Sequence, residues 1–256
     1  MNSKYKIVLG CTLFNLLLEY WAHGVEYFLE TWYATLTLFL LYLTYFSMLE
    51  DLVIRFRLRD YQVLVVGFIF GLLHETLNTG SVFGNQAFFG LDLTLLLLIN
   101  VGWWGFLQSV LAMYFANRLS ARDWAHSKMG RAGWVLSMAF NAFVLAAASL
   151  DPSHPKGSSA GYLTALTVGC LAVLLLWRTL RLRDVLPFNT SRLVDVIVVA
   201  QVALCAIVGT LLGYGNYETV GFQRHKFVVI LLIIWTLCSG LILLAFRALT
   251  RKSISV

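Results

Sequence analysis

Five polar residues recur at intervals of three or four positions through the first hydrophobic segment: Asn15, Glu19, His23, Glu26 and Glu30. On a continuous helix, all five would lie within one stripe roughly 80° wide. Ionisable side chains cost about 2.5–3.5 kcal/mol each in hydrocarbon on insertion scales, so such a stripe normally faces protein or water. We therefore predict a chemical site along this stripe. For Glu26 and Glu30, a position in water at an outer loop is the simpler interpretation.

A second polar set closes the third hydrophobic segment and consists of His74, Glu75 and Asn78. Earlier in the same segment, Gly67 and Gly71 form a small-xxx-small face, which allows two helices to approach closely. Both polar sets fall in the outer half of their segments. They are therefore expected to converge if the two helices pack together.

Two kinds of chemistry fit these two sets. Glu and His donors from two helices would suit a divalent metal, with His23 and His74 as ligands. The run His74-Glu75-x-x-Asn78 differs from the metalloprotease pattern H-E-x-x-H at its last position, where Asn is a poor zinc ligand. Without a metal, Glu19 or Glu75 could act as the acid–base group, with the histidines as partners. The alternative without chemistry is a set of satisfied hydrogen bonds between helices.

The composition defines the class of protein. The chain has 256 residues, of which 59% are hydrophobic and 12% charged, whereas soluble proteins carry about 25% charged residues. Windows of about 20 apolar residues predict eight spans, at 7–25, 32–54, 61–80, 90–114, 132–150, 160–178, 194–214 and 227–247. The predicted fold is an all-α, polytopic transmembrane helix bundle that forms a single integral membrane domain over residues 1–256.

Basic residues predict the orientation. Of the 19 Lys and Arg residues, only Lys156, Arg224 and Lys226 fall on the outer side when the N-terminus is placed inside. This asymmetry follows the positive-inside rule and predicts that both termini are cytoplasmic, in the cell (inner or plasma) membrane. The net charge of +6 is spread over several inner loops, which favours anionic membrane lipid as the partner and argues against nucleic acid.

The N-terminus also has features of a signal peptide. A basic start precedes the apolar residues 7–18, and Ala22-His23-Gly24 offers a small-x-small cleavage site. Cleavage would remove residues 1–24. Because Glu19, Tyr20 and Trp21 are charged or bulky, and because the eight-span alternation needs this segment, we expect it to be retained. The four cysteines all fall inside predicted spans and are interpreted as small buried hydrophobes.

Other residues could complete a site at the outer end of the bundle. Asn78 is predicted to orient the substrate, and Arg224 and Lys226 to hold an anionic head group. The uncharged, aromatic segment 81–90 would suit a loop that dips back into the interface. Single polar residues elsewhere are interpreted as hydrogen bonds between helices, and two central tryptophans as packing; these are Asn100, Gln108, Asn141, Gln201, Trp103 and Trp104.

The leading prediction is a multi-pass membrane enzyme, metal-dependent or acid–base, with a Glu/His site in the outer half of the bilayer and a lipid-like or amphipathic substrate. One alternative is a proton-coupled secondary transporter in which Glu19 or Glu75 carries the proton. Another is a non-catalytic subunit or assembly factor of a membrane complex, with a partner chain or a second copy bound. Nucleotide-binding and voltage-sensor motifs are absent from the sequence, so nucleotide use and voltage gating are not expected.

Overall fold

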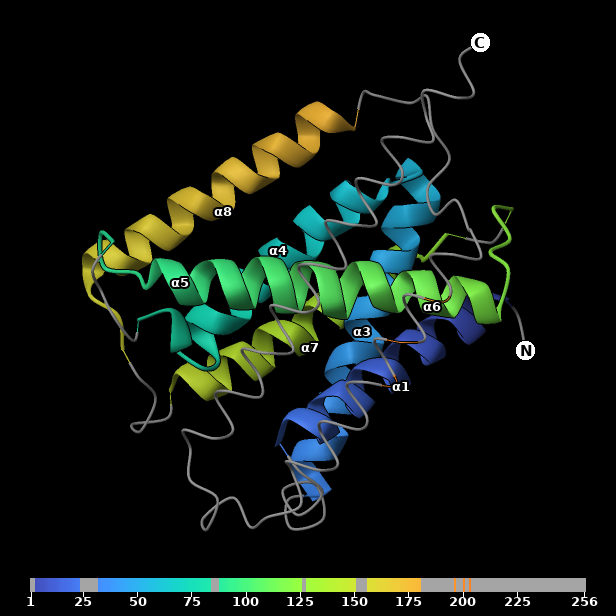
Figure 1. Ribbon diagram of the computed structural model, residues 1–256, viewed down its shortest axis with the longest axis horizontal. Coiled ribbons are helices and arrows are strands. Elements are labelled where there is room, and N and C mark those ends of the chain that lie inside the picture. Colours follow the sequence, from blue (N-terminus) through green and yellow to red (C-terminus); the bar gives the residue numbers. More distant parts are fainter. Residues whose placement is uncertain are drawn as a thin grey trace.

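The computed structural model describes residues 3–23, 32–83, 88–125, 128–150 and 156–180, together with residues 196, 200 and 203. These ranges are mostly helical and contain no β-strand (Figure 1). The long helices are α1 (Ser3–His23), α3 (Trp32–Phe56), α4 (Asp60–Leu77), α7 (Arg131–Ser149) and α8 (Ser159–Thr179). A composite helix is formed by α5 (Leu93–Leu95), η2 (Leu96–Leu111) and α6 (Ala112–Leu119), and the short 3-10 helix η1 (Ser81–Phe83) precedes it.

These helices overlap the first six predicted segments. The ranges 194–214 and 227–247 lie outside the described residues except for three isolated positions. Among the described residues, four helices are long and apolar enough to cross a membrane: Trp32–Phe56, Leu93–Arg118, Arg131–Ser149 and Ser159–Thr179. The helices α1 and α4 are not among the four. They carry Glu19 and the His74-Glu75 pair, which lower their mean hydropathy.

The composite helix lies at the centre of the described bundle. Within its most apolar window 72% of the residues are buried, against 17% for α7 and 11% for α8. Figure 1 shows it running through the middle of the bundle, with α8 on one side and α1 on the other. The helix α4 packs along η2, α1 packs on α6 and α3, α7 packs on α3, and α8 packs on α4. The outer faces of α7 and α8 are therefore apolar and exposed.

Two glycines explain the close approach of α4 to η2. A Cβ atom added at Gly67 would lie 2.3 Å from Ser109 Oγ, and one added at Gly71 would lie 2.4 Å from Trp104 Cβ. Such distances are shorter than any van der Waals contact, so only glycine fits at either position. The predicted small-residue face is thus confirmed, and its partner is η2.

The centre of the composite helix is a π-helix, whereas the sequence predicted an ordinary α-helix there. In the wider π-turn the backbone hydrogen bond joins residues five apart. In addition, the side-chain hydroxyl of Ser109 donates to the Trp104 carbonyl at 2.7 Å. This segment is hydrophobic on nearly all sides and lacks a periodic pattern, so no sequence signal distinguishes the two kinds of turn. Long π-helices are rare, and short ones often occur at functional sites.

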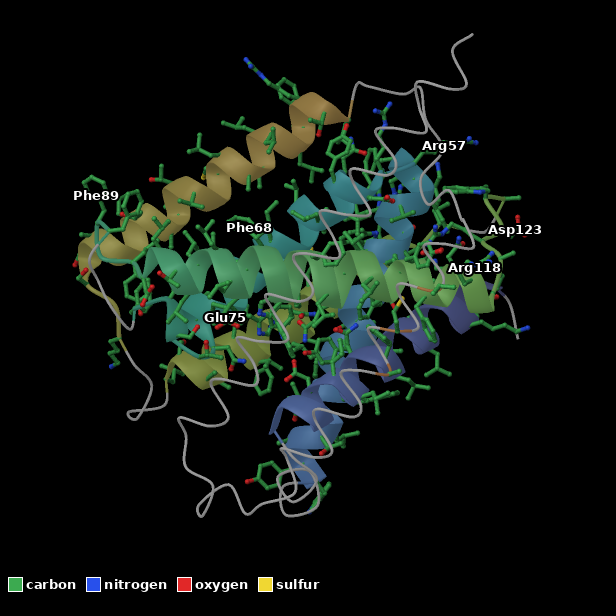
Figure 2. The ribbon with its side chains drawn as sticks, in the orientation of Figure 1. Arg57, Phe68, Glu75, Phe89, Arg118 and Asp123 are labelled. Carbon is green, nitrogen blue, oxygen red and sulfur yellow. The ribbon has the colours of Figure 1, made fainter. Side chains whose placement is uncertain are left out.

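Charged residues gather at one end of the bundle. The Ser3 hydroxyl donates to the Ala121 carbonyl at 2.6 Å, which places the start of α1 beside the segment that follows α6. Figure 2 shows Arg57, Arg118 and Asp123 at this end and Phe89 at the opposite end, with Glu75 between them. Glu75, one of the two acids that the sequence analysis singles out, therefore lies away from the charged end.

Candidate functional site

The Glu75 carboxylate is surrounded by hydrogen-bond donors. Its Oε1 accepts from Trp104 Nε1 at 2.7 Å, and its Oε2 accepts from the hydroxyls of Thr79, at 2.7 Å, and Ser81. The residue is only 6% exposed. The donors come from η2, from the turn after α4 and from η1, so the chain after α4 folds back over the carboxylate. Buried carboxylates require such donors because an unsatisfied one would cost several kcal/mol.

The Glu19 carboxylate lies in a second hydrogen-bond network. Its Oε1 accepts from the Tyr42 hydroxyl and from Gln108 Nε2, the latter at 2.6 Å, and Gln108 Nε2 is also 2.8 Å from the Tyr42 oxygen. One turn earlier on α1, Asn15 Nδ2 donates to the Gln108 carbonyl at 3.1 Å. This Glu19 network, made of Asn15, Glu19, Tyr42 and Gln108, ties α1, α3 and η2 together.

The two carboxylates belong to one polar region, which we call the polar cluster: the Glu19 network together with His74, Glu75 and Trp104. The rings of Tyr42 and Trp104, which donate to Glu19 and Glu75 respectively, lie 6.1 Å apart. The polar sets of α1 and α4 thus do come together. They meet across η2, whose Trp104 and Gln108 contact one carboxylate each.

His74 is the member of the polar cluster with an open position. Its ring lies between Phe70, at 4.6 Å, and Trp104, at 5.1 Å, and it is 1% exposed. Its Nδ1 lies 3.4 Å from the Asn78 amide nitrogen, whereas Nε2 has no hydrogen-bond partner among the described residues. When Asn78 donates to Nδ1, the neutral imidazole carries its proton on Nε2. This N–H group is then buried without an acceptor, at a cost of about 1–3 kcal/mol.

Buried amides near the polar cluster also lack partners. Both side-chain polar atoms of Asn100, the Oε1 of Gln108 and the Oδ1 of Asn15 make no hydrogen bond with the described residues. Buried polar atoms are nearly always satisfied by protein, water or ligand. Partners for these atoms on η2 and α1 must therefore come from outside the described residues, and water or a polar ligand could supply them.

The single polar residues of the other helices behave partly as predicted. Gln108 does bond across helices, and so does Asn141, whose Nδ2 donates to Thr44 Oγ1 at 2.9 Å. Asn100 makes no such bond within the described part of the chain. Gln201 lies outside the described residues.

The described residues contain no group of three or more His, Cys, Asp or Glu side chains placed to hold a metal ion. The ring of His74 faces aromatic side chains and Asn78. The side chain of His23, the other predicted ligand, is outside the described part of the structure. Metal binding by His23 and His74 therefore stays a prediction.

The other predicted site residues divide in the same way. Asn78 contacts His74 and so positions the imidazole, while Glu26, Glu30, Arg224 and Lys226 are outside the described residues. The sequence did not identify Tyr42 as part of the site, nor the hydroxyls of Thr79 and Ser81 that donate to Glu75. Thr79 carried a usable signal, because it lies four residues after Glu75 on the same helical face.

An apolar cavity of about 590 Å³ lies between α4 and α8, where Leu72, Thr76 and Tyr162 contribute to its wall. Gly71 and Glu75 instead contact η2, on the opposite side of α4. The cavity is therefore separate from the polar cluster.

Comparison of the chain with protein-family models, with curated proteins and with solved structures finds no match. The chemistry available to the polar cluster is that of two carboxyls and one imidazole among neutral donors, away from the charged end of the bundle.

Proposed function

We propose that the protein is a membrane enzyme that performs acid–base chemistry on a lipid-like or amphipathic substrate. The proposal places the polar cluster in the outer half of the bilayer of the cell membrane, with both termini in the cytoplasm. The observation that carries it is His74 Nε2, which is buried in the polar cluster and has no hydrogen-bond partner among the described residues.

Three residues of the polar cluster, and several outside it, have roles in this proposal. His74 exchanges a proton with the substrate through Nε2, and Asn78 fixes the imidazole through Nδ1. Glu75, oriented by three donors, and Glu19 balance the positive charge that His74 acquires with a proton. The amide of Asn100, which has no hydrogen-bond partner among the described residues, is proposed to bind a polar group of the substrate. Arg224 and Lys226 are retained as candidates for an anionic head group.

The test compares the lipids of cells that produce the wild-type protein with those of cells that produce variants. We expect at least one lipid species to change when the wild type is produced, as measured by mass spectrometry of total extracts. His74→Gln should reduce that change by about 10²–10⁴-fold, the usual contribution of a general acid or base. Asn141→Ala, which removes a buried amide outside the polar cluster, is the matched control and should retain the activity.

A lipid profile that is identical for the wild type and His74→Gln, at equal protein levels, would contradict the enzyme proposal. If function instead survives loss of both Glu19 and Glu75 while a partner protein co-purifies in fixed ratio, a non-catalytic subunit becomes the better interpretation.

Proton-coupled transport is the second candidate, and one observation favours it. Two buried carboxyls, Glu19 and Glu75, lie in hydrogen-bond networks that join α1, α3, α4 and η2, and intramembrane acids of this kind often carry protons. Purified protein in vesicles with a pH-sensitive dye inside distinguishes the candidates. A transporter would acidify the vesicles with its solute and lose that ability with Glu75→Gln, without forming any new lipid.

A further inference from the structure

A second cavity, of about 630 Å³, opens at the charged end of the bundle between the end of α3 and the start of α7. Its wall combines the basic side chains of Arg55, Lys128 and Arg131 with the apolar side chains of Leu52 and Phe56. The volume is within the range of about 300–1,000 Å³ that is typical of ligand pockets. Nothing in the proposed enzyme activity uses this cavity.

One buried acid, Asp51, bonds three residues that line this cavity. The Asp51 carboxylate accepts from the Met129 backbone N–H at 2.6 Å, from Trp134 Nε1 at 2.9 Å and from Arg55 at 2.9 Å. These bonds fix the segment before α7, and α7 itself, against α3. The position of the cavity wall is therefore set by the folded protein before any ligand binds.

The charges around the cavity do not cancel. Asp51 neutralises Arg55, whereas neither Lys128 nor Arg131 has an ion-pair partner in the described part of the chain. Two exposed cations thus remain at the mouth of the cavity. A ligand with a phosphate group would complement this charge.

The apolar surface continues beyond the cavity along α7. Val135, in the cavity wall, is 65% exposed, and the neighbouring Leu136 is 70% exposed. Only 17% of the apolar window of α7 is buried in the bundle, and that helix is long and apolar enough to cross a membrane. A ligand whose phosphate lies at the cavity would have an apolar helix face beside it for hydrocarbon chains.

We propose that this cavity binds the head group of an anionic phospholipid, with the phosphate between Lys128 and Arg131 and the acyl chains along α7. Charge and apolar surface meet at one place, and a phospholipid is the ligand that has both. Free phosphate would not contact the apolar wall of the cavity. A zwitterionic lipid would bring its own positive charge close to Lys128 and Arg131, which would repel it. The site is separate from the polar cluster, so this proposal does not depend on the enzyme proposal.

The experiment uses the full-length protein in detergent and measures bound lipid by native mass spectrometry, with added phosphatidylglycerol or phosphatidylcholine as probes. The wild type should retain phosphatidylglycerol in preference to phosphatidylcholine. Replacement of both cations, Lys128→Ala with Arg131→Ala, should weaken phosphatidylglycerol binding about thirtyfold. This factor corresponds to about 1 kcal/mol for each basic residue, at about 1.4 kcal/mol per tenfold.

Two further variants separate a defined site from general attraction between charges. Lys156→Ala with Arg178→Ala removes two exposed cations elsewhere and should leave phosphatidylglycerol binding unchanged. Lys128→Arg with Arg131→Lys keeps the charge and should retain most of the binding. Equal loss of binding in the Lys156/Arg178 variant, or no preference of the wild type for phosphatidylglycerol, would overturn the proposal. Binding of inorganic phosphate without retention of phosphatidylglycerol would also overturn it.

Discussion

Two regions of the bundle hold buried acids in contrasting ways. At the charged end, Glu50 forms a two-pronged ion pair with Arg122, at 2.8 and 2.7 Å, and Asp51 pairs with Arg55 at 2.9 Å. In the polar cluster, the hydrogen bonds described for Glu19 and Glu75 come from neutral donors: hydroxyls, an amide and an indole. Among the described residues, no cation pairs with Glu75.

The contrast suggests that the acids of the charged end hold the helices together, whereas those of the polar cluster are able to take part in proton exchange. A carboxylate that forms an ion pair with a guanidinium fixes one element against another, as Glu50 fixes α3 to the segment after α6. A carboxyl that is held by neutral donors can gain or lose a proton without breaking an ion pair. The polar cluster is therefore suited to proton exchange, and the charged end to holding the fold together.

The largest loss of stability is expected from breaking the Glu50–Arg122 pair. Both side chains are almost completely buried, so Glu50→Gln leaves the guanidinium without its counter-charge and should cost about 3–5 kcal/mol. Unfolding of the purified protein by a denaturing detergent, followed by tryptophan fluorescence, would measure this loss.

The control for this variant removes both partners. Glu50→Leu combined with Arg122→Leu leaves no buried charge and should recover part of the stability. If Glu50→Gln unfolds within about 0.5 kcal/mol of the wild type, as ordinary surface substitutions do, the charged end is not what holds the fold together.

A smaller loss is expected at the contact between α4 and η2. In Gly71→Ala the new methyl group would overlap Trp104 and should cost about 1–3 kcal/mol, the usual effect of overpacking. It should also move the Trp104 indole away from Glu75, so both unfolding and tryptophan fluorescence should change. Gly169→Ala on α8 is the matched control, because its nearest neighbour would be Leu72 Cδ2 at an ordinary 3.5 Å.

For Glu75→Gln the effect on stability should be small although the proposed effect on activity is large. The amide keeps an acceptor for Trp104 and can donate to the hydroxyls of Thr79 and Ser81, so the cost should be about 1 kcal/mol. The same change should abolish either proposed activity. A loss of stability as large as that of Glu50→Gln would show that Glu75 belongs with the structural acids, and the contrast between the two regions would fail.

The sequence was sufficient for most of the helices and for part of the site. Hydrophobic windows predict helices whose ranges match α1, α3, α4, α7 and α8, because burial in an apolar environment leaves a continuous signal along the chain. The small residues Gly67 and Gly71 and the pair His74-Glu75 were visible for a similar reason: glycines and ionisable groups stand out against an apolar background.

The partners of these residues could not be predicted from the same signals. Tyr42 and Gln108 lie 23 and 89 residues from the carboxylate of Glu19, and only tertiary packing brings them together. Trp104 was interpreted as packing because an indole in an apolar segment carries no mark of the hydrogen bond that it will donate. The π-turns of η2, which carries Trp104 and Gln108, also leave no periodic pattern in a helix that is hydrophobic on nearly all sides.

The smallest expected effect concerns a neutral hydrogen bond outside both regions, and it sets the scale for the others. Thr44→Val removes the acceptor of Asn141 Nδ2, which still donates to the Ser137 carbonyl at 2.7 Å. The loss should be about 0.6 kcal/mol, the average for hydrogen bonds between membrane helices, measured by the same detergent unfolding.

Tyr42→Phe, two residues earlier on α3, removes a hydroxyl that donates to the Glu19 carboxyl. Hydrogen bonds to charged groups contribute about 1.5–3 kcal/mol, so Tyr42→Phe should cost clearly more than Thr44→Val wherever Glu19 is ionised. Equal losses at every pH would mean that the Glu19 network is held together like any neutral pair, and the case for proton exchange would then rest on Glu75 and His74 alone.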